Sequence, residues 1–318
     1  MSITIGEEQQ FVQNRRLNRG VNIIGYDPLW KSRTKAKMQD EHFKLIKEAG
    51  FSTVRINLHP FQYGRIDQNL KLSEVWLETL DWAIEQALSN KLMVILDFHE
   101  YNAMGKNLMG NKAQFISVWK QIAERYEKYP YDIIFEILNE PNGELTPSLW
   151  NQFLREALAV IREKNPDRTA IIGPAHWNSI SYLEEHDLPQ DDRDIIVTVH
   201  YYSPMEFTHQ GASWTSYKDK VGVEWYGTPE ERSAITQDFG RAQAWAQRHD
   251  RPIFLGEFGV YDRADMASRV RYVSFVAREA ERMGWSWAYW QFDSDFIVYD
   301  IPNKKWVTPI RDALIPSE

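Results

Sequence analysis

The chain has 318 residues, a formal net charge of −8 at pH 7 and no cysteine. The lack of cysteine excludes disulfides, thiolate metal sites and cysteine nucleophiles. Acidic and basic residues are interspersed without a long basic run, which argues against nucleic acid or an anionic membrane as a partner. No stretch approaches the roughly 18 apolar residues of a membrane span. A neutral substrate fits this composition.

Residues 1–10 have neither a basic start nor an apolar run, so they do not read as a secretory signal. The protein either lacks such a signal or has had it removed, and the sequence leaves both possibilities open. We find no repeat, linker or low-complexity segment. We therefore expect residues 1–318 to form a single domain, and we expect a monomer.

Apolar runs and helical patterns alternate along the chain. Buried strands are predicted at residues 20–25, 53–58, 92–98, 133–140, 169–174, 195–202, 252–258 and 286–292. Helices are predicted at about 38–49, 73–88, 115–126, 150–161, 229–248, 264–283 and 308–314. In the clearest helix, the spacing of six large or apolar residues places them on one face; they are Phe115, Val118, Trp119, Ile122, Ala123 and Tyr126.

This alternation predicts the fold. Apolar strands that alternate with helices form a parallel sheet covered on both faces. Eight such units are the number that closes a (β/α)₈ TIM barrel, and the length fits. The competing open, doubly wound sheet normally carries a glycine-rich phosphate turn after its first strand, and Gly20 and Gly25 do not form one. We therefore predict an α/β protein with a single (β/α)₈ TIM barrel.

Polar and aromatic side chains recur in or directly after the predicted strands. They are Arg55, His99, Asn139, Glu140, His200, Tyr202, Glu257 and Trp290. The carboxyl ends of barrel strands converge on one mouth, where TIM-barrel enzymes carry their active sites. One such residue alone would be read as a surface group or an ion-pair partner, but together they predict a single site. Pro141 is expected to end its strand and to hold Glu140 in an extended backbone.

Glu140 and Glu257, in a chain without a cysteine or serine nucleophile motif, indicate glycoside hydrolysis. One carboxyl group would protonate the leaving oxygen and the other would attack the anomeric carbon. Retaining enzymes need carboxyl groups about 5–5.5 Å apart and inverting enzymes about 6.5–9.5 Å, and the barrel mouth allows either. Arg55, His200 and Tyr202 would stabilise an anionic nucleophile. The acid instead needs a pKa raised by less polar surroundings.

Two further acids lie close to this group. Glu136 shares a strand face with Glu140, so we read it as a buried structural partner of Arg55. Glu100 follows His99 at a strand end and could touch substrate.

Aromatic residues near the predicted mouth can stack on sugar faces, with core packing as the alternative. They are Trp30, Trp177, Trp214, Trp225 and Trp290. Residues 203–227 form the longest connection and contain two of these tryptophans. Because long loops are usually either functional or disordered, we expect this one to be ordered and functional.

Over nearly its whole length the chain resembles glycoside hydrolase family 5, of the large retaining β/α-barrel clan. The most specific matches are Phe135-Glu-Ile-Leu-Asn-Glu140-Pro and Gly256-Glu257-Phe-Gly. Supporting matches are Val54-Arg55-Ile, His99, His200-Tyr-Tyr202 and Trp287-Ala-Tyr-Trp290. The segment 199–212 looks like the thermophilic endoglucanase subgroup.

The resemblance implies a role for each matching residue. Glu140 would be the general acid/base and Glu257 the nucleophile of a retaining mechanism, which decides between the two spacings. Asn139 would hold the sugar 2-hydroxyl, and His99 would line the −1 subsite with Trp290 as its floor. The residues expected to position and tune the nucleophile are Arg55, His200 and Tyr202. Asn22 and Trp177 complete the expected substrate-binding set.

Two departures from the subgroup lie near the cleavage point. Glu100 stands where the subgroup often has a second histidine, and Asn22 is not followed by the usual glutamate, which leaves the choice between glucan and mannan open. We predict an endo-β-1,4-glucanase that acts on a β-linked polysaccharide or oligosaccharide, with no cofactor and no metal. We expect residues 1–318 to be its one catalytic domain, without a carbohydrate-binding module. The alternatives are a β-mannanase or a mixed glucanase, mannanase and xyloglucanase; a non-catalytic carbohydrate-binding barrel; and a metal-dependent hydrolase that uses His99 and His200.

Overall fold

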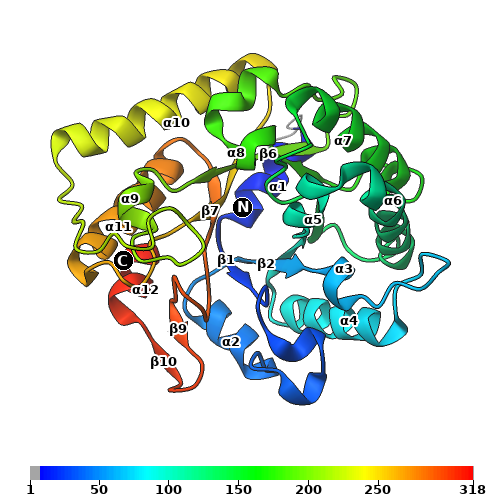
Figure 1. Ribbon diagram of the computed structural model, residues 1–318, viewed down its shortest axis with the longest axis horizontal. Helices are drawn as coiled ribbons and strands as arrows, with labels where there is room; N and C mark the ends of the chain where they lie inside the picture. Colours follow the sequence, from blue (N-terminus) through cyan, green and yellow to red (C-terminus); the bar gives the residue numbers. More distant parts are fainter. Residues whose placement is uncertain (1–7, 318) are drawn as a thin grey trace.

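The computed structural model describes residues 8–317, and within them eight parallel strands close into a barrel (Figure 1). The strands are β1 (Arg19–Ile23), β2 (Thr53–Leu58), β3 (Met93–Phe98), β4 (Ile133–Glu136), β5 (Ala170–Ile172), β6 (Ile195–Tyr201), β7 (Ile253–Phe258) and β8 (Ser286–Tyr289). Pairing of β1 with β8, which brings Gly20 opposite Ala288, closes the ring. The predicted (β/α)₈ TIM barrel is therefore confirmed.

The longer helices lie around the barrel where the sequence predicts them (Figure 1). They are α2 (Asp40–Glu48), α4 (Glu74–Ser89), α6 (Leu108–Arg125), α7 (Pro147–Arg162), α10 (Pro229–His249), α11 (Met266–Arg282) and α12 (Thr308–Leu314). The apolar stripe predicted on residues 115–126 is buried from end to end. Burial of such a face against the strands is what stabilises a helix of this length.

Short elements in the loops were not predicted. They are the helices α1 (Gln9–Leu17), α3 (Pro60–Tyr63), α5 (Tyr101–Lys106), α8 (Ala175–Asn178) and α9 (Met205–Thr208), the 3₁₀ turns η1 (Pro28–Trp30), η2 (Arg33–Lys35) and η3 (Ile180–Glu185), and an antiparallel pair of β9 (Tyr299–Asp300) with β10 (Lys305–Trp306). Most of them fall in loops that follow strands, so they shape the mouth of the barrel.

Helix α1 covers the opposite end of the barrel. The amide of Asn14 donates to the carbonyl of Ile253, 3.1 Å away, and accepts from the hydroxyl of Ser286 at 2.6 Å. These two partners are the first residues of β7 and β8, so α1 lies across the start of the strands. Its buried face is largely polar, which is why the sequence shows no apolar stripe there.

The barrel interior changes from apolar to polar toward its mouth. A buried apolar layer fills the lower part; its members are Leu17, Met93, Ile95, Ile134, Ile171, Ile196, Phe254 and Ala288. Two residues further along their strands, on the same inward face, stand Asp97, Glu136 and Thr198, all fully buried. The apolar layer thus supports a floor of polar and charged groups beneath the site.

Among residues 8–317, no helix combines the length and the apolar character needed to cross a membrane. The segment used to assess a secretory signal includes residues 1–7, which lie outside the described part of the chain.

Candidate active site

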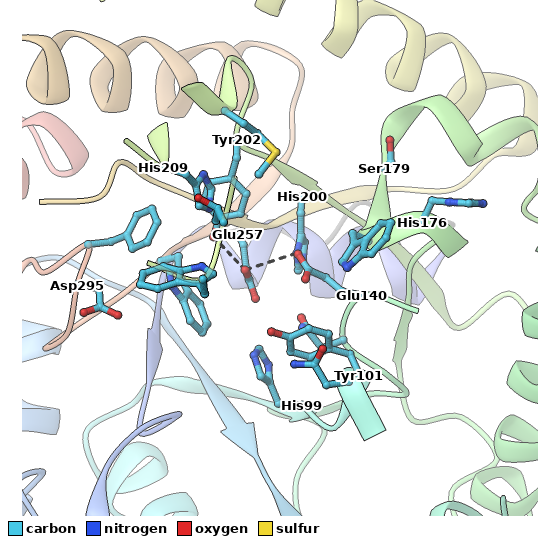
Figure 2. A pocket seen from close by; sticks show the side chains of 18 of the residues that line it. His99, Tyr101, Glu140, His176, Ser179, His200, Tyr202, His209, Glu257 and Asp295 are labelled. Atoms are coloured by element: carbon cyan, nitrogen blue, oxygen red, sulfur yellow. Dashed lines mark hydrogen bonds and ion pairs between the residues drawn. The ribbon is translucent and has the colours of Figure 1, made fainter. Parts of the chain in front are cut away.

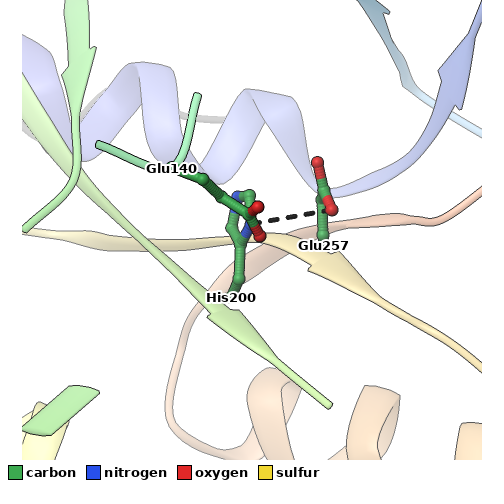
Figure 3. A group of neighbouring side chains, drawn as sticks. All are labelled: Glu140, His200 and Glu257. Atoms are coloured by element: carbon green, nitrogen blue, oxygen red, sulfur yellow. Dashed lines mark hydrogen bonds and ion pairs between the residues drawn. The ribbon is translucent and has the colours of Figure 1, made fainter. Parts of the chain in front are cut away.

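Glu140 and Glu257 face one pocket of about 1020 Å³ at the carboxyl ends of the strands (Figure 2). Glu257 lies in β7, and Glu140 lies four residues beyond the end of β4. One carboxylate oxygen of each residue and one ring nitrogen of His200 lie within 4.8 Å of one another (Figure 3). The inverting arrangement needs carboxyl groups about 6.5–9.5 Å apart to admit a water, and the retaining one about 5–5.5 Å. The observed approach suits the retaining arrangement.

The Glu257 carboxylate is held from below and from the side. Arg55 Nη1 lies 2.9 Å from its Oε1, and the Tyr202 hydroxyl donates to its Oε2 at 2.9 Å. The same guanidinium forms a bidentate pair with Glu136, with N–O distances of 2.6 and 2.8 Å. This is the structural partnership expected for Glu136. A guanidinium and a phenol hydroxyl both stabilise the negative form of Glu257.

Asn22 and Arg55 lie beneath the pocket and are fully buried. Arg55 Nη1 donates to Asn22 Oδ1 at 2.7 Å, and Arg55 Nη2 donates to Asn139 Oδ1 at 2.8 Å. The structure therefore places Asn22, which was expected to contact substrate, beneath the pocket, whereas Arg55 contacts Glu257 as its expected tuning role requires. Because their polar groups are already bonded to one another and to Glu257, they support the site and do not line it.

The backbone at Glu140 differs from the expected extended form. Its φ is 43°, in the left-handed region, although proline follows. The Asn142 amide donates to the Glu140 carbonyl at 2.8 Å, and the Trp177 backbone N–H donates to the Pro141 carbonyl at 3.1 Å. These bonds hold a conformation that costs about 1–3 kcal/mol, and such strain collects at functional sites.

Burial raises the pKa of the Glu140 carboxyl to about 7, against the opposing charges of His99 and Arg55. His200 Nδ1 lies 2.8 Å from Glu140 Oε1 and 3.6 Å from Glu257 Oε2. Burial lowers the pKa of His200 to about 4, so the imidazole is neutral near pH 7. His200 was expected to tune Glu257, but its shorter bond is to Glu140.

His99 and Trp290 form one wall of the pocket. Their rings stack with centroids 5.5 Å apart and planes 6° from parallel. His99 Nδ1 lies 2.6 Å from Asp97 Oδ2, and this carboxylate raises the pKa of His99 in spite of its burial. Glu100, for which a substrate contact was left open, does not line the pocket. It accepts hydrogen bonds from the backbone N–H groups that begin α3, at residues 61 and 62, over 2.8 and 3.0 Å.

Three of the five predicted mouth tryptophans line the pocket, namely Trp177, Trp214 and Trp290. Trp177 and Trp214 are 52% and 56% exposed, so their faces are free to receive a sugar. Trp30 and Trp225 are buried core residues instead. Trp30 stacks on Trp76, and Trp225 packs edge-on against Tyr272.

The long connection at residues 203–227 is ordered and forms another wall. The Gln210 amide bonds the backbone N–H and the carbonyl of Val223 at 3.0 and 2.8 Å, which closes the loop on itself. Residues from this segment that line the pocket are Ser203, Met205, His209, Trp214 and Thr215. The loop therefore lies where a functional segment was expected.

Several pocket residues were not predicted. They are Tyr26, Tyr101, Asn102, His176, Ser179, Ser203, Met205, His209, Thr215, Asp295 and Phe296. All lie in loops that follow barrel strands. The rule that such loops build the site in this fold could have found them as a group, but it does not say which side chain of a loop turns inward.

Within residues 8–317, one group of three acidic or histidine side chains is close enough together to hold a metal ion. It consists of Glu140, His200 and Glu257. Each already has a protein partner, and His200 is bonded to Glu140 itself. Since the group is satisfied by its own hydrogen bonds, we assign no metal ligands there. His99, which the metal-dependent alternative requires, is not part of the group.

A family model described as cellulase (glycosyl hydrolase family 5) matches residues 15–295. Endoglucanase H of Acetivibrio thermocellus is 29% identical over 315 residues, covering 96% of this chain and 33% of that protein. The chain thus spans about a third of the length of this relative.

Solved structures match along almost the full chain. Thermotoga maritima Cel5A in complex with cellobiose is 41% identical and has a TM-score of 0.91, with 96% of this chain and 100% of that chain covered. The same enzyme in complex with mannotriose is 40% identical, with a TM-score of 0.91 and coverage of 96% and 100%.

Proposed function

The chain belongs to glycosyl hydrolase family 5, and from this premise we propose that it is an endo-β-1,4-glucanase that hydrolyses internal glucan bonds with retention. The observation that supports this most is the approach of the Glu140 and Glu257 carboxylates to within 4.8 Å. At this separation the anomeric carbon and its glycosidic oxygen fit between the two groups, but an additional attacking water does not.

In the first step Glu257 attacks the anomeric carbon while Glu140 gives its proton to the departing glycosidic oxygen. The bond to the leaving sugar breaks and a glycosyl ester of Glu257 forms. In the second step the Glu140 carboxylate takes a proton from water, the water oxygen attacks the anomeric carbon, and the ester bond breaks. Glu140 must therefore change its protonation state twice in each cycle.

The surroundings of the two carboxyl groups suit these opposite tasks. Glu257 receives hydrogen bonds from Arg55 and Tyr202, which favour a negative nucleophile. Glu140 has its pKa raised to about 7 by burial, which keeps a proton available near neutral pH. Two acids whose environments differ in this way are the arrangement expected of an acid and a nucleophile.

Sugar binding follows from the pocket walls. The amide Nδ2 of Asn139 is buried and has no hydrogen-bond partner among the described residues, so it is free to donate to a sugar hydroxyl. The stacked pair of His99 and Trp290 would receive the ring at the cleavage point. Trp177 and Trp214 would stack on more distant sugars.

The test is to remove each carboxyl group and supply azide. Glu257→Ala should lower the rate at least 10³-fold, because loss of the nucleophile removes one of the largest contributions to the rate enhancement. With azide and an activated cellobioside it should form the α-glycosyl azide, because azide attacks from the face that Glu257 leaves. Glu140→Ala should give the β-azide, because azide intercepts the glycosyl ester of Glu257. The reverse assignment of products, or near-normal turnover of either variant, contradicts the pair.

A mannanase or a mixed glucanase and mannanase is the second candidate, favoured by the mannotriose complex of the Thermotoga maritima relative. Assays on carboxymethylcellulose, lichenan, xyloglucan and mannan side by side distinguish the two, and activity on mannan alone rejects the glucanase. Full loss of activity with chelators would instead support the metal-dependent alternative. Binding without turnover on every substrate would support a non-catalytic barrel.

A further inference from the structure

Asn178 lies behind the histidine that contacts Glu140. It is fully buried at the end of α8, and its Nδ2 lies 3.2 Å from Nε2 of His200. On the far side of the same ring, Nδ1 of His200 lies 2.8 Å from Glu140 Oε1. The three side chains thus form one chain of hydrogen bonds that ends on the acid/base carboxyl.

The direction of this chain follows from the donors it contains. In the structure the Asn178 NH₂ faces this ring nitrogen. Because an NH₂ group donates only, Nε2 of His200 accepts the bond. A neutral imidazole carries a single N–H, and His200 is neutral near pH 7 because burial lowers its pKa to about 4. Its proton therefore stands on Nδ1 and points at Glu140. A donor at this position stabilises the ionised carboxylate over the protonated acid.

The amide of Asn178 is closely packed, and its Oδ1 is buried without a hydrogen-bond partner among the described residues. A Cβ on Gly173 would lie 2.2 Å from Asn178 Oδ1, so the amide packs against a stretch of backbone that only glycine leaves open. The residue itself belongs to a run of three left-handed residues, His176, Trp177 and Asn178, with φ of 57°, 59° and 55°. Such a run is unusual outside glycine and is maintained only when the surroundings hold it.

The same turn carries a sugar-stacking candidate and contacts the loop of the acid. Trp177 is 52% exposed and lines the pocket, while its backbone N–H donates to the carbonyl of Pro141, the residue after Glu140. A single strained turn therefore connects to the Glu140 region twice, once through its backbone and once through His200.

We propose that Asn178 is a positioning residue that holds His200 in its Nδ1–H tautomer and thereby sets the protonation of Glu140. The inference rests on the proposed function only where it gives Glu140 the acid/base role. The tautomer itself is a property of the resting protein and is open to measurement without substrate.

Other charged or titratable groups also face Glu140, and within the described residues no hydrogen bond or ion pair joins any of them to Asn178. They are Glu257, Arg55, Asp97, His99, Tyr26, Tyr101 and Tyr202. A change at Asn178 therefore acts on Glu140 through His200.

The direct test is nitrogen NMR of protein labelled with ¹⁵N-histidine, in which long-range proton–nitrogen correlations distinguish the two tautomers. The His200 signals are assigned by their loss in His200→Gln. Wild type should show a protonated Nδ1 and a bare Nε2. Asn178→Asp places an acceptor opposite Nε2, so the proton should move to Nε2. A wild-type Nε2–H tautomer, or the same tautomer in Asn178→Asp, overturns the proposal.

The second readout is the pH profile of kcat/KM. In Asn178→Asp, Nδ1 loses its proton and becomes an acceptor, so the protonated form of Glu140 is favoured. The basic limb of the profile, where kcat/KM falls as the pH rises, should move to higher pH by about one unit. This is the size expected for the loss of a hydrogen bond to a charged group. An unmoved limb, or a shift to lower pH, contradicts the proposal.

Two further variants separate this effect from damage to the fold. Asn178→Gly keeps the left-handed backbone without strain and should show a mixture of tautomers and a smaller upward shift. Asn151→Asp is the matched control, because it makes the same chemical change on α7 at a residue that does not line the pocket. It should leave both tautomer and limb unchanged. If the tautomer moves as expected but the azide products reject Glu140 as acid/base, the positioning role stands and the proposed function fails.

Discussion

Burial disfavours the ionised form of Glu140 and raises the pKa of its carboxyl to about 7. The first chemical step needs the protonated form. The rate of that step should therefore hold below pH 7 and fall about tenfold per pH unit above it, as the acid loses its proton. The measurement is kcat/KM against pH with a cellobioside whose leaving group is a poor one.

A matched substrate tests the assignment of this limb. A dinitrophenyl cellobioside has a leaving group that departs without a proton, so its kcat/KM should lose the basic limb. Persistence of the same limb with both substrates would show that another group, not Glu140, controls it. Glu140→Gln should likewise keep most of its kcat/KM on the activated substrate, since this constant reports formation of the glycosyl ester, and lose it on the poor one.

At the scale of single residues, sequence patterns identified which side chains gather but not how deep each one lies. Alternation along β1 and β2 turns Asn22 and Arg55 inward, yet it cannot distinguish a residue that lines the pocket from one beneath it. The left-handed backbone of Glu140 was not predicted, since the rule for residues before proline favours extended forms. Tertiary hydrogen bonds from Asn142 and Trp177 override that preference.

At the scale of elements, strands and long helices were predictable because each buries a periodic apolar face. Helix α1 has a polar buried face bonded to strand ends, so it carries no such signal. Trp30 and Trp225 show the same limit, because an aromatic side chain in a loop suits a core and a sugar site equally well. Only the three-dimensional contacts with Trp76 and Tyr272 decide between them.

The packing between β6 and β7 around His200 leads to a further prediction. Their register shifts between Val199 and His200, which sets His200 opposite Glu257. Gly256 makes room for this: a Cβ there would lie 2.6 Å from Thr198 Oγ1 and 2.9 Å from His200 Nε2. Gly256→Ala should therefore displace the imidazole and lower kcat on the order of 10²-fold. The overpacking should cost about 1–3 kcal/mol of unfolding free energy.

Gly240→Ala is the control, because nothing lies within 4 Å of the added Cβ in helix α10. It should leave kcat unchanged and raise the unfolding free energy by about 0.5–1 kcal/mol, the helix preference of alanine over glycine. Steady-state rates and urea unfolding of both variants check the pair. A Gly256→Ala enzyme with the activity of Gly240→Ala would show that His200 has room to move.

At the scale of the whole molecule, the guanidinium of Arg55 links four of the barrel strands through its ion pairs. Arg55 on β2 contacts carboxylates from three other strands, at 3.2 Å from Asp97 on β3, 2.6 Å from Glu136 on β4 and 2.9 Å from Glu257 on β7. All four side chains are almost fully buried. Loss of one partner from such a group leaves charge without compensation in a place that water does not reach.

Arg55→Met should therefore lower the unfolding free energy by about 3–5 kcal/mol at pH 7, besides removing activity.

The sign of the pH dependence follows from Asp97. Although burial raises the pKa of this carboxyl, Arg55 and His99 lower it to about 2. Stability from this carboxylate is present above its unfolded pKa and is lost as the pH falls toward 2. The penalty of Arg55→Met should accordingly be smaller at about pH 3 than at pH 7, because the wild-type protein loses the contribution of Asp97 in that range. At pH 7, Glu136→Gln in the same chain should restore part of the loss. Lys44→Met, which breaks an exposed pair with Glu48, should cost at most about 1 kcal/mol at either pH. Urea unfolding at both pH values measures all three variants. An Arg55→Met cost no larger than that of Lys44→Met would mean that the strands, not the ion group, hold the barrel mouth together.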